Sequence, residues 1–158
     1  MKDDKTNVMR LLDQAGIGYK AYSYECEGVP TGVEVAQILG LEVDRVFKTL
    51  VTAGRSGEHY VFVVPVAATL DLKKAATAVG EKSIEMIKSK DLLPLTGYIH
   101  GGCSPIGMKK PLRTTVDESC ILFDTIVFSA GKIGRQVELS PDDLKKIVNY
   151  EIADLCVM

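Results

Sequence analysis

The chain has 158 residues, of which 46% are hydrophobic and 25% charged, a size and balance typical of one globular domain over residues 1–158. A formal net charge of −2 and a pI near 5.7 exclude the strongly basic surface of a nonspecific nucleic-acid binder. The start, MKDDKTNVMR, has no secretion-signal pattern, and no apolar run is long enough to span a bilayer. We therefore expect a cytoplasmic protein with no membrane partner.

The N-terminal half predicts helices that begin at a capping side chain and end at a glycine. Thr6 and Asp71 can each cap a helix, and Thr31 and Glu34 form a capping-box pattern. These signals predict helices over residues 5–16, 31–39 and 72–79. Strands are predicted over 19–24, 46–53 and 59–66, and a glycine-containing turn joins the last two as a hairpin.

The C-terminal half is predicted to be mostly short strands, over residues 98–102, 112–117, 121–123, 125–130 and 135–139. A short helix over 89–93 should end at Pro94, and Ser140-Pro141 should open a last helix. Residues 152–158 are expected to be a strand or a frayed tail. Because helices and strands do not alternate regularly, a doubly wound parallel sheet is disfavoured. We expect an α/β protein of the α+β type, with a mixed, mostly antiparallel, barrel-like sheet of about seven strands surrounded by four to five helices.

The cysteines and histidines show no familiar catalytic or metal-binding pattern. No two cysteines lie closer than seventeen positions, which excludes paired zinc ligands, and we expect no metal and no cofactor. The four thiols are predicted to be reduced and mostly buried, with the role of Cys103 left open by its glycine-rich loop. His59 and His100 stand in no triad order, so an enzyme of this sequence would lack a conventional activated nucleophile.

Three segments depart from simple packing patterns. Lys48 shares a strand face with apolar neighbours, so it lies either at a sheet edge, which the pattern alone favours, or in a pocket facing an anion or a carbonyl. Gly101 and Gly102 let the backbone approach a ligand, or form a plain turn. The segment 128–135 either places the Ser129 hydroxyl and the cations of Lys132 and Arg135 at a functional strand end, or is an ordinary solvated hairpin.

Taken together, these segments resemble the YbaK family of free-standing aminoacyl-tRNA deacylases. The motifs FKTL, VPVAATLDLKKAA, TGY, GGCSPIG and SAGKIG, with ELS before the last helix, match that family in order and spacing. The family is similar to the editing insertion of bacterial prolyl-tRNA synthetases. The resemblance implies a mixed, barrel-like sheet surrounded by helices, in agreement with the predicted elements.

The resemblance also implies roles for individual residues. Lys48 matches the family's key lysine, which contacts the substrate near the 3′-terminal ribose and phosphate. The implied pocket residues are Tyr24, Thr31, Gly101, Gly102, Ser129 and Gln136. Two of them depart from the family pattern, because Thr31 stands where the family has phenylalanine and Gln136 where it has aspartate.

The function implied is removal of cysteine mischarged onto tRNA(Pro), in which the cysteinyl thiol attacks its own ester and leaves as a thiolactone. The implied partners are the acceptor end of tRNA(Pro) and, transiently, prolyl-tRNA synthetase. Alternatives are deacylation of alanine or another small residue, and a non-catalytic module that binds tRNA or a synthetase. A local basic rim is predicted from Lys73, Lys74, Lys109, Lys110, Arg113, Lys132 and Arg135.

Overall fold

The computed structural model describes residues 5–157. Within them the chain forms five α-helices: α1 (Asn7–Gln14), α2 (Gly32–Leu39), α3 (Leu72–Val79), α4 (Ser89–Thr96) and α5 (Pro141–Ile147). One sheet has the order β1-β7-β6, from Lys20–Ser23, Arg135–Leu139 and Ile126–Lys132. The other has the order β4-β2-β3-β5-β8, from Ile84–Met86, Phe47–Gly54, His59–Pro65, Arg113–Asp117 and Tyr150–Ala153.

The predicted helix caps are present and explain where the helices begin. Thr6 and Asp71 accept backbone N–H groups at the starts of α1 and α3, and Thr31 with Glu34 forms the complete capping box of α2. Gly40 and Gly80 end α2 and α3 in the left-handed conformation. Local sequence therefore determines these helices almost to the residue.

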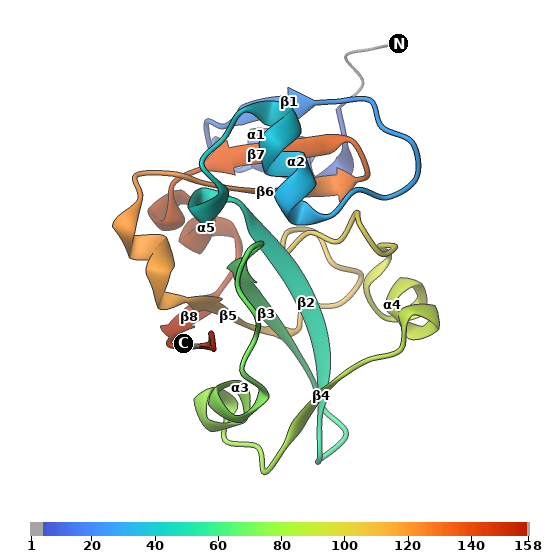
Figure 1. Cartoon of the computed structure of the whole chain (residues 1–158), viewed down its shortest axis with the longest axis vertical. Helices are drawn as coiled ribbons and strands as arrows, with labels where there is room; N and C mark the ends of the chain where they lie inside the picture. The colour runs from blue at the N-terminus through green and yellow to red at the C-terminus, as the bar shows by residue number, and fades with distance from the viewer. Residues whose placement is uncertain (1–4, 158) are drawn as a thin grey trace.

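Most strand pairs are antiparallel, but β3–β5 and β5–β8 run parallel. An isolated bridge between Val46 and Val127 connects the two sheets where β2 begins. Figure 1 shows the long β2 beginning beside the smaller sheet and running down through the larger one. Within the described residues the sheets do not close into a barrel, so the α/β class is confirmed but the barrel-like shape is not.

Several predicted elements were wrong. The helix predicted to end at Pro94 continues to Thr96, because the hydroxyl of Thr96 bonds the Leu92 carbonyl and Gly97 closes the helix. Residues 98–102 form a loop instead of a strand, and residues 121–123 fall mostly in a 3₁₀ helix, Glu118–Leu122. The strands β4 and β8 were missed or displaced, and residue 158 lies outside the described part.

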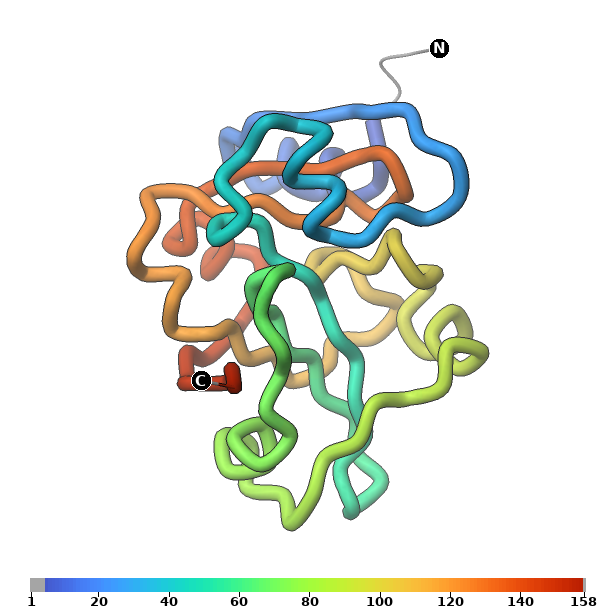
Figure 2. The backbone as a smooth tube through the Cα atoms, viewed as in Figure 1, coloured from blue at the N-terminus to red at the C-terminus, as the bar shows by residue number. Residues whose placement is uncertain are grey.

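The larger sheet packs an apolar cluster on each face, one shared with the smaller sheet and one shared with α3. Phe47 and Val51 face the cluster beneath the smaller sheet, whereas Leu50 packs toward α3 and the C-terminal strand. The backbone trace in Figure 2 shows the loop after α4 running back beside the middle of β2. No helix among the described residues has the length and apolar character needed to cross a membrane.

Candidate active site

A cavity of about 320 Å³ opens beside the first half of β2. Its walls come from the 24–32 segment, the start of β2, the loop after α4 and the paired ends of β6 and β7. The structure brings together most of the residues implied by the resemblance: Tyr24, Thr31, Lys48, Gly101, Ser129 and Gln136 all line the cavity. Segments more than 100 positions apart in sequence thus meet at one site.

Lys48 is the principal charged group of this cavity. It pairs with Val64 across the hairpin, and its Nζ donates to the Val66 carbonyl at 3.4 Å. Burial among apolar walls lowers the pKa of Lys48, and only the neighbouring Cys156 opposes that shift. Among the described residues no carboxylate lines the cavity and none forms an ion pair with Lys48. Its ammonium is therefore available to an anionic or carbonyl ligand.

Thr49 is a cavity residue that the sequence analysis missed. Its hydroxyl is buried without a hydrogen-bond partner among the described residues, although it lies in a wall of the cavity. The strand around it is also open on one side, since β4 pairs with β2 only over Thr52–Gly54. A buried hydroxyl with no protein partner has its hydrogen-bonding capacity free for a ligand. Its burial is a tertiary property, so no sequence pattern signals it.

Two glycines are required by close approach at the cavity wall. Gly101 has φ +87°, and a Cβ there would lie 2.4 Å from the Cγ1 atom of Val29. Gly32 begins α2, and a Cβ at this position would lie 2.3 Å from Cγ1 of Val66. Gly102 does not line the cavity; it is buried against the backbone of Lys132 and Ile133, where a Cβ would approach to 3.3 Å. It supports the loop from behind.

Ser129, Gln136 and Tyr24 form the wall contributed by the smaller sheet. Ser129 pairs with Gln136 beside a bulge, and its Oγ accepts the Gly131 N–H at 3.0 Å. The backbone N–H of Tyr24 donates to the Gly134 carbonyl at 2.9 Å. Burial raises the pKa of the Tyr24 phenol. These groups are polar and neutral, so they can orient a ligand without adding charge.

The thiol of Cys103 lies in the cavity wall but is not activated. Burial raises its pKa to about 12, so it is protonated near neutral pH. His100 also lines the cavity and is exposed. The expectation of mostly buried cysteines is only partly correct, because Cys26 is exposed and only Cys120 is fully buried.

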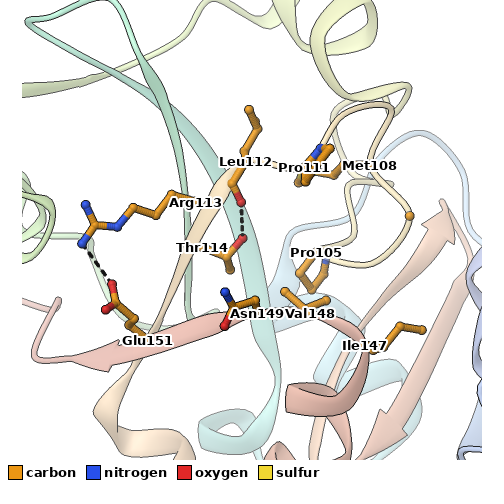
Figure 3. A pocket seen from close by; sticks show the side chains of 11 residues that line it. Pro105, Met108, Pro111, Leu112, Arg113, Thr114, Ile147, Val148, Asn149 and Glu151 are labelled. Atoms are coloured by element: carbon orange, nitrogen blue, oxygen red, sulfur yellow. Dashed lines mark hydrogen bonds and ion pairs between the residues drawn. The ribbon is translucent and has the colours of Figure 1, made fainter.

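A larger groove of about 640 Å³ lies between residues 105–114 and residues 147–151 (Figure 3). None of the pocket residues implied by the resemblance lines it, and its two charged groups, Arg113 and Glu151, pair with each other at 3.0 Å. Lys74 likewise pairs with Asp154 at 3.0 Å. Two members of the predicted basic rim are thus neutralised, and none of the seven lines the candidate cavity. The smaller cavity therefore fits the candidate chemistry better.

Comparison with known proteins identifies the family to which the fold and sequence are similar. The aminoacyl-tRNA editing domain family matches residues 26–147, which include most of the cavity residues. A protein of Enterococcus faecalis, provisionally named a Cys-tRNA(Pro)/Cys-tRNA(Cys) deacylase, is 45% identical over 96% of this chain and 93% of its own. The multifunctional Ser/Thr-tRNA deacylase of Escherichia coli is 23% identical over 93% and 89% of the two chains. The crystal structure of a provisionally assigned trans-editing enzyme for prolyl-tRNA synthetase superposes with a TM-score of 0.80 at 27% identity, covering 98% of this chain and all of that one.

Proposed function

Because this chain belongs to the aminoacyl-tRNA editing domain family, we propose that it is an aminoacyl-tRNA deacylase whose substrate is cysteine mischarged onto tRNA(Pro). The relative that is 45% identical carries a name with this substrate. The observation that carries the proposal is chemical. The cavity combines one unpaired lysine with neutral polar groups and no activated protein nucleophile among the described residues.

Such a cavity suits a substrate that brings its own nucleophile. The cysteinyl thiol loses its proton to solvent, and the thiolate attacks the carbonyl carbon of its own ester. The bond from that carbon to the ribose oxygen breaks, the ribose oxygen takes up a proton, and the amino acid leaves as a thiolactone. An aminoacyl ester is already activated, so positioning and directed charge supply what remains.

Each cavity residue has a task in this scheme. The Lys48 ammonium stabilises negative charge at the ribose and phosphate end of the substrate. Gly101 lets the loop backbone approach the aminoacyl group, and Gly102 holds that loop against Lys132–Ile133. Thr31, Ser129 and Gln136, together with Tyr24 and Thr49, orient the ester by neutral hydrogen bonds.

The cavity volume supports a small side chain. Ligand cavities in proteins run from roughly 300 to 1,000 Å³, and about 320 Å³ must hold the amino acid and part of the terminal ribose. A pocket separates near-isosteres by only about 10–200-fold, so shape alone would not spare correctly charged proline. The requirement for a thiol supplies the missing selectivity, because proline has none.

The partners proposed are the acceptor end of tRNA(Pro) and, transiently, prolyl-tRNA synthetase. With a net charge of −2 and a cavity lined by a single lysine, the protein has no strong overall attraction for phosphate, so binding of free tRNA should be weak.

The test is loss of the aminoacyl ester from tRNA(Pro) charged with cysteine, alanine or proline. We expect rapid loss of cysteine and little loss of the other two. Preferred release of alanine would assign the protein to the small-residue alternative. If no ester is lost faster than without protein, the non-catalytic alternative replaces the proposal.

A further inference from the structure

A pair of large apolar side chains stands exposed outside the cavity. Ile121 and Leu122, in the 3₁₀ helix Glu118–Leu122, are 67% and 76% exposed, the highest values among the described large apolar residues. Their segment, orange in Figure 1, projects on the side of the molecule away from α4. Adjacent exposed apolar side chains within a polar rim are typical of an interaction site.

The rim of this pair is acidic. Leu122 and Asp124 line a small hollow of about 340 Å³ together with Glu42 and Arg45. Glu118 lies three residues before Ile121, so both fall on one side of the 3₁₀ helix. Among the described residues, Glu42, Glu118 and Asp124 form no ion pair. We refer to Ile121, Leu122, Glu42, Glu118 and Asp124 as the acidic–apolar patch.

The basic groups near the patch are already engaged. Arg45 pairs with Glu138 and donates to the Thr125 hydroxyl. Lys145 lies close enough to the buried Cys120 for its charge to act on the pKa of that thiol, and its Nζ donates to the Tyr150 carbonyl. Lys145 keeps its own charge, but Glu42, Glu118 and Asp124 have no ion-pair partner among the described residues. Their negative charge repels a nucleic acid and attracts a basic protein surface.

The patch also lies at a useful distance from the cavity. Arg45 lines the hollow of the patch and Lys48 lines the cavity. The two residues are three positions apart along extended chain, which is about 10 Å at roughly 3.3 Å per residue. A protein docked on the patch would thus sit beside the cavity that contains Lys48.

From these observations we propose that the acidic–apolar patch docks the synthetase that charges the tRNA, through apolar side chains ringed by lysine and arginine. The identity of this partner rests on the proposed function. A protein that holds tRNA carries basic surface around its RNA site. Docking there would hold the editing cavity next to the acceptor end and would give tRNA selectivity to an acidic protein.

The test is a binding isotherm between the full chain and purified prolyl-tRNA synthetase with tRNA(Pro), at low and high salt. The double variant Ile121→Ser/Leu122→Ser should weaken binding about tenfold or more. The variant Glu118→Lys/Asp124→Lys should weaken binding at low salt and abolish its salt dependence. The matched control is Glu85→Lys/Met86→Ser on β4, which changes an adjacent acid and a 46% exposed methionine and should bind as the unmodified protein does.

Unchanged binding by both patch variants would overturn the proposal. A shift of the protein's own sedimentation from dimer to monomer in the apolar variant would overturn it too, since the occupant would then be a second copy. Release of cysteine from free Cys-tRNA(Pro) is measured in parallel and should be unaffected by either patch variant. If the unmodified protein releases no cysteine in that assay, the proposed function is contradicted. The binding isotherm remains a separate test of the acidic–apolar patch as a docking surface.

Discussion

Replacing Gly101 by alanine adds one carbon atom at a point where the cavity wall has no room for it. The new Cβ would lie 2.4 Å from the Cγ1 atom of Val29 and 3.4 Å from Cγ1 of Ile133. The backbone φ of +87° adds strain, because a non-glycine residue in this region costs about 1–3 kcal/mol. Val29 is 48% exposed on the loop before α2, so it has room to yield by moving outward.

The two costs can be separated by a matched control. Gly97 has a similar φ of +85°, but a Cβ added there would have only the Cβ atom of Lys109 nearby, at 3.8 Å. Gly97→Ala therefore carries the backbone strain alone. We expect it to lower the free energy of unfolding by about 1–2 kcal/mol, roughly 2–8 °C in Tm, and to leave deacylation unchanged.

Gly101→Ala should lose at least as much stability and, in addition, about tenfold in kcat/KM for Cys-tRNA(Pro), because the displaced Val29 opens the cavity. Adding Val29→Ala removes the clashing methyl groups and should restore most of the activity without restoring all of the stability. Thermal unfolding and ester release are measured on all four proteins. Full activity in Gly101→Ala, or no rescue by Val29→Ala, would refute this view of the cavity wall.

Three further predictions concern the groups around the ester. Lys48→Ala should fold normally and lose roughly 10²–10³-fold in deacylation rate; a variant rate close to that of the unmodified protein would show that Lys48 has no role in the reaction. Cys103→Ala should keep most activity because the Cys103 thiol, with a pKa of about 12, is protonated at neutral pH; a covalent aminoacyl adduct on Cys103 would contradict this. The rate should rise with pH as the substrate thiol ionises, by up to about tenfold per unit, and then fall as Lys48 loses its proton. Burial lowers the pKa of Lys48 below 10.5. The deacylation rate should therefore begin to fall at a lower pH than it would with an ordinary lysine. A pH–rate profile that stays flat would contradict both the role of the substrate thiol and the role of Lys48.

Local signals predicted the helices well because a cap is a property of a few neighbouring residues. Thr6, Thr31 and Asp71 accept backbone N–H groups within their own helices. The apolar run at 121–123 misled the strand prediction, since a hydrophobic pattern assumes burial and Ile121 and Leu122 are exposed. The short strands β4 and β8 depend on pairing with β2 and β5, which no local pattern encodes.

The residues of the candidate site likewise divide into those that a sequence motif identifies and those that only the folded structure reveals. Lys48, Gly101 and Ser129 were identified through motifs and do line one cavity. Thr49 and Gly32 were missed, because the burial of one hydroxyl and the 2.3 Å approach of a Cβ to Val66 arise only when distant segments pack. Sequence motifs thus located the charged and turn residues, whereas the fit of the wall required the fold.

The central claim, that the substrate supplies the nucleophile, is tested most directly by changing the thiol alone. Ester release is measured from tRNA(Pro) charged with cysteine, with serine or with S-methylcysteine. Serine is slightly smaller than cysteine and S-methylcysteine slightly larger, and neither has a free thiol. We predict fast release of cysteine only, with the thiolactone trapped as the first product. Release of S-methylcysteine or serine at a rate comparable to that of cysteine would show that water or a protein group attacks the ester, and would contradict the account.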